Sequence, residues 1–190
     1  GGAGVKKETE SAEHHTKRWA DAQAAGMIRP SMKHDIASNC MACHGLARPE
    51  LDGDTVGKML ADGHPINPDF ELVRYSQGTV RHRFYPPDTT SNAEMSQVEL
   101  ARLFVTGQAA QLVSATSALS KSNDPAYQQA QKKRLDDAKA ALSAVTSVPE
   151  AAALVAAPSE DKARQLVAAI ADKDLSGEVG KLLPDKSSYK

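Results

Sequence analysis

The stretch CMACHG at residues 40–45 decides how the rest of this sequence is interpreted. Its first five residues have the pattern Cys-x-x-Cys-His, in which two thiols stand three residues apart and an imidazole follows at once. On a helical turn, Cys40 and Cys43 project to the same side. Each thiol can then form a thioether with a vinyl group of one haem, and His44 brings an imidazole nitrogen to the iron. The pattern predicts one covalently attached haem c with His44 as the proximal ligand.

Three other chemistries use a Cys-x-x-Cys pair. A thioredoxin-type redox pair belongs to a βαβ context, which this sequence does not show. A zinc site needs two further ligands, and only His34, His64 and His82 could supply them. A disulfide across two intervening residues is strained and uncommon. We favour haem over these three alternatives, which stay open.

The composition is that of an ordinary globular chain of 190 residues, with 41% hydrophobic residues, 25% charged residues and a formal net charge of −1. Two cysteines are too few for a disulfide scaffold. No stretch reaches the roughly 18–20 consecutive apolar residues of a membrane span, and the balanced charge gives no basic field for nucleic acid. Both cysteines, all five methionines and all six histidines lie at or before Met95. The ligands of an iron atom are therefore expected in the first half.

Three segments are expected along the chain. Residues 1–16 are polar and form a flexible lead without a visible signal peptide, residues 17–107 form the haem domain, and residues 108–190 form an alanine-rich helical extension. Short loops favour antiparallel packing of the helices in the extension. Apolar spacing predicts buried positions there at Tyr127, Ala130, Ala138, Leu142, Val145, Ala163, Leu166, Val167, Ile170, Leu175, Val179 and Leu182.

Capping and turn signals predict the local elements. Helices are predicted over residues 17–25, 36–44, 54–61 and 96–105, with further helices at Pro125, at Pro149 and after Ser159, and with short strands over 72–75 and 79–84. Ser31 or Asp35 is the expected cap of the second helix. Ser96 and Glu99 fit a capping box, and Gly107 is expected to end the helix that they begin.

The surroundings of the motif are similar to those of class I cytochromes c. Residues 38–45 (SNCMACHG) resemble the haem-binding helix of that family, residues 51–53 (LDG) resemble the proline- or leucine-glycine stretch that follows it, and residues 96–104 (SQVELARLF) resemble the family's last helix. The resemblance covers residues 27–107 and implies an all-α, cytochrome c-like fold around one haem. The helical extension has no counterpart in a minimal member of the family.

The sequence departs from the family pattern at the residue that would bind the other side of the iron. Class I cytochromes place a Met in the loop before the last helix, and the corresponding loop here, residues 78–87, contains none. His82 lies in this loop and is the expected distal ligand, which would give bis-histidine ligation. Met95 is the alternative, although a residue before a helix cap commonly packs against the first turn, here against Leu100. His64 ranks third.

The expected function is the transfer of single electrons between redox partners, with no catalytic residues of its own. The protein is expected to be a carrier in a bacterial periplasm or a subunit of a larger electron-transfer complex, attached to the membrane through that complex or a lipid anchor. The extension would serve as a buttress of the haem domain or as a docking surface for the complex or for a second copy. The alternative is a haem enzyme, or a gas- or peroxide-binding sensor, whose distal iron position is open or labile.

Overall fold

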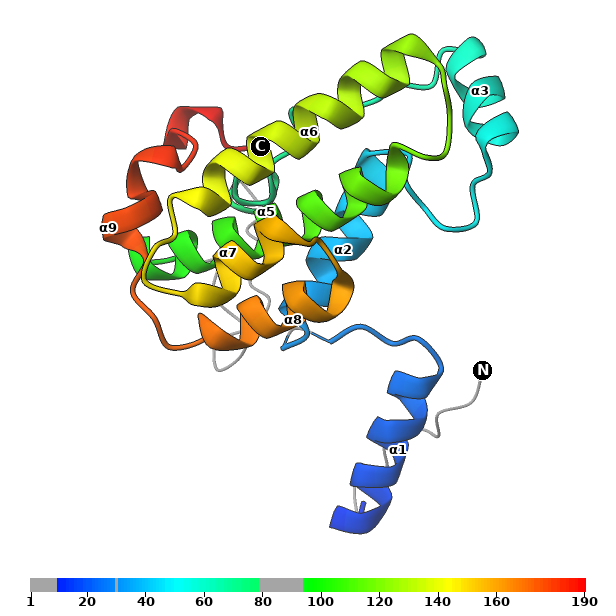
Figure 1. Cartoon of the computed structure of the whole chain (residues 1–190). Helices are drawn as coiled ribbons and strands as arrows, with labels where there is room; N and C mark the ends of the chain where they lie inside the picture. Colours follow the sequence, from blue (N-terminus) through cyan, green and yellow to red (C-terminus); the bar gives the residue numbers. More distant parts are fainter. Residues whose placement is uncertain (1–9, 30, 79–93) are drawn as a thin grey trace.

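The computed structural model describes residues 10–29, 31–78 and 94–190, and within them every regular element is a helix (Figure 1). This confirms the all-α class. The elements are α1 (Ala12–Ala24), α2 (Lys33–His44), α3 (Gly53–Ala61), α4 (Leu72–Ser76), α5 (Gln97–Ala118), α6 (Pro125–Ser143), α7 (Pro149–Ala156), α8 (Glu160–Ala169), α9 (Ser176–Val179) and the 3-10 turns η1 (Gly180–Leu182) and η2 (Lys186–Ser188). No helix in these ranges is long and apolar enough to cross a membrane.

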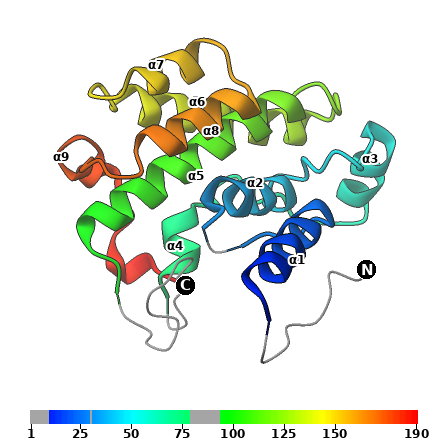
Figure 2. The ribbon, with the colours of Figure 1, turned by 90° about the horizontal axis from the view of Figure 1, so that it is seen from below.

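The long helix α5 is the centre of the fold. It begins at the predicted capping box, in which Ser96 Oγ accepts from the Glu99 N–H at 3.3 Å and the Glu99 carboxylate accepts from the Ser96 N–H at 2.7 Å. It packs against α2, α4, α6, α8 and α9. Figure 2 shows α7 and α8 on the side of α5 that faces away from α1. Because neighbours surround it, α5 has buried residues all around its axis.

Gly107 does not end this helix, contrary to the prediction. α5 continues through Gly107 to Ala118, so the expected domain boundary between residues 107 and 108 falls inside a helix. A Cβ at position 107 would lie 2.9 Å from Leu72 Cβ and 3.8 Å from Met41 Cε. The glycine therefore allows α4 and α2 to approach α5 closely, which is a packing function that the sequence alone does not distinguish from helix termination.

The second half folds back along α5. Gln128 Nε2 donates to the Leu119 carbonyl at 2.8 Å, and Gln111 Nε2 donates to the Arg134 carbonyl at 3.0 Å, so α5 and α6 run antiparallel as predicted. Asp124 caps α6, whose first residue is Pro125. Of the positions predicted to be buried in the extension, Val167 is only half-buried and Leu182 is 45% exposed, because η1 turns its side chain outward.

Three local predictions in the first half need correction. Residues 72–75 form helix α4 and not a strand, because the Glu71 carboxylate accepts from the N–H groups of Val73 and Arg74 and so begins a helical turn. Neither Ser31 nor Asp35 caps α2, which begins after Met32 without a side-chain cap. The first helix begins at Ala12, within the expected flexible lead. The strand predicted over 79–84 lies outside the described residues.

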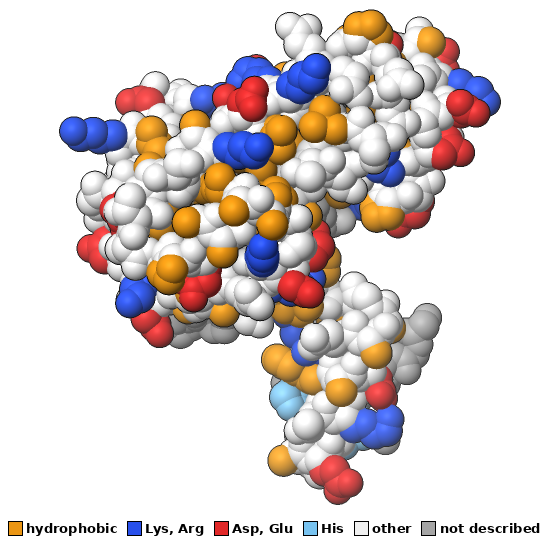
Figure 3. Space-filling model, viewed as in Figure 1, with side chains coloured by type: hydrophobic (Ala, Val, Ile, Leu, Met, Phe, Trp, Pro, Cys, Tyr) orange, Lys and Arg blue, Asp and Glu red, His pale blue; other side chains and the backbone are white. Residues whose placement is uncertain are grey.

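Helix α1 extends away from the body of the molecule (Figures 1 and 3). On the face drawn in Figure 3, acidic and basic side chains are interspersed, and no large region carries charge of a single sign.

The turn between α6 and α7 depends on Glu178 of α9. Its carboxylate accepts from the N–H of Thr146 at 2.5 Å, the N–H of Ser147 at 3.0 Å and the Ser147 hydroxyl at 2.6 Å. These hydrogen bonds, that of the Ser147 side chain above all, lower the pKa of Glu178 to about 2. The ionised carboxylate therefore stabilises the fold at neutral pH, and this contribution is lost as the pH falls from about 4.5 towards 2.

Glu178→Gln is expected to remove this acid dependence. Between pH 5 and pH 2 the wild type should lose about 1 kcal/mol more unfolding free energy than the variant, a value reduced for solvent screening. Urea unfolding followed by circular dichroism at each pH measures the difference. Glu50→Gln, which changes an exposed carboxylate, is the matched control and should follow the wild type. Parallel pH profiles for Glu178→Gln and wild type would contradict the assignment.

Candidate functional site

Helix α2 presents two faces of different character. Ala37 and Met41 are 0% and 1% exposed and belong to the main core. Cys40, Cys43 and His44 follow the spacing i, i+3, i+4, which places them together on another face. Cys43 and His44 are exposed, Cys40 is half-buried at the edge of the core, and both cysteines are free thiols. The three predicted haem-binding residues thus share one side of the helix, and the adjoining side, with Ala37 and Met41, is fixed in the core.

The imidazole of His44 lies flat against Phe70. The ring centroids are 3.9 Å apart and the planes differ by 9°. Tyr75 of α4 completes an aromatic cluster, with its ring 4.8 Å from that of Phe70. Within the described residues neither nitrogen of His44 has a hydrogen-bond partner. Partial burial, together with the nearby Arg134 guanidinium, lowers the pKa of His44, so the ring is neutral at pH 7 and keeps a free lone pair.

The end of α2 and the turn after it are held from behind by the second half of the chain. Four side chains there bind main-chain carbonyls of residues 41–51, and we call this set the carbonyl clamp. Its bonds run from Lys121 Nζ to Arg48 O (2.9 Å) and Leu51 O (2.8 Å), from Tyr127 Oη to Leu46 O (3.0 Å), from Gln131 Nε2 to Gly45 O (2.7 Å) and from Arg134 Nη2 to Met41 O (3.0 Å). Met41 O lies in the last turn of α2, and the other carbonyls belong to Gly45 and to the turn that follows it.

Sequence reasoning placed only one member of the clamp, Tyr127, at a buried position. Gln131 and Arg134 follow it at i+4 and i+7 on the same face of α6 and are 0% and 2% exposed. Long polar side chains in register with a buried stripe are the signal that could have indicated them, because a buried polar group needs a partner.

Gly45 leaves the space that the Arg134 side chain of the clamp occupies. A Cβ at this position would lie 2.1 Å from Arg134 Nη1, so the guanidinium occupies the space that a side chain at residue 45 would fill. Gly53 is similarly close to the backbone, because a Cβ there would lie 2.1 Å from the Lys121 carbonyl oxygen. The glycines at positions 45 and 53 are thus explained by contacts with the second half of the chain.

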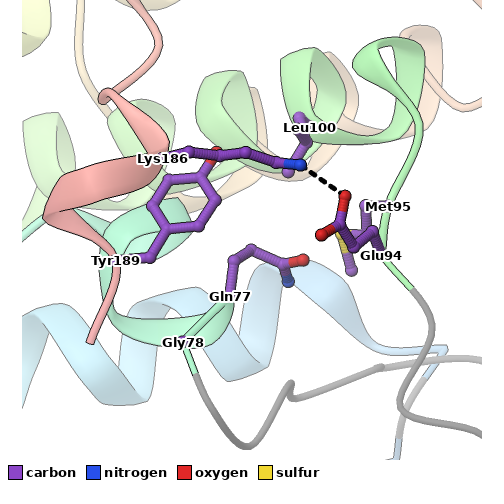
Figure 4. A pocket seen from close by; sticks show the side chains of 7 residues that line it. All are labelled: Gln77, Gly78, Glu94, Met95, Leu100, Lys186 and Tyr189. Atoms are coloured by element: carbon purple, nitrogen blue, oxygen red, sulfur yellow. Dashed lines mark hydrogen bonds and ion pairs between the residues drawn. The ribbon is translucent and has the colours of Figure 1, made fainter.

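Of the three residues considered for the distal side, Met95 and His64 can be located. His82 lies outside the described residues. Met95 is 7% exposed and lines a cavity of about 310 Å³ together with Leu100, next to Gln77, Lys186 and Tyr189 (Figure 4). Its position directly before the cap of α5 and beside Leu100 is that of a hydrophobic staple.

The other histidines that the structure describes do not join the Cys-x-x-Cys pair. His34 lies in the first turn of α2, about 15 Å from His44 by the helical rise, and its Nε2 is 2.6 Å from Glu160 of α8. The exposed His64 has its Nδ1 3.0 Å from its neighbour's carbonyl. Among residues 10–29, 31–78 and 94–190, no three His, Cys, Asp or Glu side chains are grouped to hold a metal ion.

The donor set fits a covalently attached haem. Two free thiols and a neutral imidazole stand on one accessible face, and the aromatic rings of Phe70 and Tyr75 give that face an apolar wall. Burial, with the neighbouring Cys43, raises the pKa of the Cys40 thiol, whereas the nucleophilic cysteine of a redox pair has a lowered pKa.

Comparison with protein families, curated proteins and solved structures finds no match. The chemistry of the site therefore rests on its own residues.

Proposed function

We propose that this protein is a monohaem c-type cytochrome that transfers single electrons between redox partners. The observation that carries the proposal is the common side of Cys40, Cys43 and His44 on a helix whose adjoining side is fixed in the core. Cys40 and Cys43 would hold the haem through thioethers, and His44 would be its proximal axial ligand. The bound haem supplies a one-electron couple between ferric and ferrous iron.

The residues around the motif support electron transfer by restricting motion. Phe70 stacks on the imidazole of His44 and fixes the plane of its ring. The carbonyl clamp fixes the turn that follows His44. Groups that orient an axial ligand from outside the coordination sphere of the metal also influence the properties of that metal, such as its redox potential. A rigid site that needs no substrate pocket is what a one-electron carrier requires.

The partners and the location follow from the same proposal. Thioether attachment of haem takes place outside the bacterial cytoplasm, so we place the protein in the periplasm, as a free carrier or as part of a larger membrane-associated complex. The carbonyl clamp favours the buttress function of the second half, because four of its side chains bind the main chain beside the motif. Docking to redox proteins or to a second copy remains the second function proposed for these helices.

The distal ligand can be tested with a pair of variants. His82→Ala is expected to convert the low-spin ferric protein to high spin and to let the ferrous protein bind CO, because it removes the proposed sixth ligand. Met95→Ala is expected to keep the low-spin spectrum while lowering the unfolding free energy by about 2 kcal/mol, since Met95 is a buried staple residue. Optical spectra and urea unfolding measure both effects. Loss of the low-spin spectrum in Met95→Ala, with the same spectrum kept in His82→Ala, would identify Met95 as the distal ligand.

Maturation in a bacterial periplasm with the c-type haem attachment system tests the function itself. We expect one covalent haem, a low-spin spectrum that CO does not change, and reversible one-electron reduction. A ferrous spectrum that changes fully with CO would overturn the carrier function and favour the haem enzyme or sensor. A protein that leaves the attachment system without haem would overturn the proposal.

A further inference from the structure

We infer that Arg134 is a positioning residue of the haem site, whose buried positive charge behind the Cys-x-x-Cys-His turn raises the reduction potential. The inference rests on the proposed function and deepens it. It assigns to the second half of the chain a chemical effect on the site in addition to its mechanical support.

The guanidinium of Arg134 is almost fully enclosed. The residue is 2% exposed and is the largest of the fully buried side chains among the described residues. Nη1 donates to Gln131 Oε1 at 2.6 Å, and Nη2 donates to Met41 O at 3.0 Å and to Ser114 Oγ at 3.2 Å. All of these acceptors are neutral, and no described carboxylate forms an ion pair with Arg134. Its charge is therefore solvated by dipoles and is not cancelled.

The charge is placed directly behind the proximal ligand. Nη1 occupies the position of a side chain at Gly45, the residue that follows His44. Nη2 binds Met41 O, one of the last carbonyls of α2, where the helix dipole favours a cation. Because Arg134 is buried and its guanidinium lies directly against the turn, the field of the charge is screened much less than at the surface.

Hydrogen bonding alone does not explain an arginine here. A neutral amide can hold a carbonyl of this turn, as Gln131 does at Gly45. A buried cation without an anionic partner carries a desolvation cost that a neutral donor avoids. The specific consequence of the charge is electrostatic, since ferrous haem carries one positive charge fewer than ferric haem and is therefore favoured beside Arg134.

Redox potentiometry of the haem-loaded protein tests the inference with matched variants. Arg134→Gln keeps hydrogen-bond donors and removes the charge, and Arg134→Lys keeps the charge. Gln131→Glu keeps the arginine and adds a carboxylate at the atom that it already binds, although it also removes the Nε2 donor to Gly45 O. Lys132→Gln removes an exposed charge from the same helix and is the control.

We expect Arg134→Gln and Gln131→Glu to lower the ferrous-to-ferric ratio at a fixed ambient potential about tenfold, which is a shift of 59 mV for one electron. Arg134→Lys and Lys132→Gln should stay within about twofold of the wild type. A reduction potential that is unchanged in Arg134→Gln, or that falls as far in Arg134→Lys as in Arg134→Gln, would overturn the inference. Covalent haem in these variants would still support the proposed function. If Arg134→Gln does not fold, an unchanged potential in Gln131→Glu overturns the inference.

Discussion

Replacing Cys40 and Cys43 together by alanine is expected to abolish covalent haem attachment while leaving the fold in place. The two thiols are the only cysteines in the chain, so no other side chain can form the thioethers. Cys43 is exposed and Cys40 is half-buried, so the double substitution should change the unfolding free energy of the haem-free protein by about 1 kcal/mol or less. Intact mass after periplasmic maturation and circular dichroism measure the two parts of this expectation.

His44→Ala separates attachment from ligation. We expect this variant to lose the low-spin spectrum, because the iron loses its proximal nitrogen, and His64→Ala, which changes an exposed histidine, to behave as the wild type. Haem mass retained by the double cysteine variant would contradict the assignment of the thiols. A low-spin spectrum retained by His44→Ala would contradict that of the imidazole.

Gly45→Ala is expected to lower the free energy of unfolding by about 3 kcal/mol, although it adds one methyl group. The backbone of Gly45, at φ −96° and ψ 2°, is accessible to alanine, so the cost does not come from the backbone. It comes from Arg134 Nη1, which would lie 2.1 Å from the new Cβ. The guanidinium cannot move aside without losing its bonds to Met41 O and Gln131 Oε1.

Gly57→Ala is the matched control for this prediction. Gly57 lies inside α3 and has no atom within 4 Å of the position of a Cβ. Alanine should there raise the free energy of unfolding by about 0.5–1 kcal/mol through helix propensity. Urea unfolding of the three proteins provides the comparison. A Gly45→Ala protein as stable as the wild type would show that the clamp does not depend on close approach at this residue.

Local signals predicted the elements that are determined by local contacts. Asp52 before α3, the Ser96–Glu99 box before α5, Asp124 with Pro125 before α6 and Ser159 before α8 all bind N–H groups of the next turn. A cap of this kind needs no partner from elsewhere in the chain. The first residues of these helices could therefore be predicted closely from the sequence.

Elements determined by distant contacts could not be predicted in this way. Gly107 continues a helix because α4 packs against it, and that contact joins residues far apart in the sequence. The motif itself can be read from the sequence, since Cys40, Cys43 and His44 form a local pattern. The clamp was not predicted, because Gln131 and Arg134 bind carbonyls roughly ninety residues earlier, and carbonyls are common to all residue types.

The reduced pyridine haemochrome of the wild-type protein, matured in a bacterial periplasm, directly tests covalent haem attachment at Cys40 and Cys43. We expect an absorption maximum at the position of haem c, an amount of one haem per chain, and haem that stays with the protein under conditions that extract non-covalent haem. A protein of native helicity whose spectrum has no haemochrome band, or whose haem is extracted completely, would contradict this expectation.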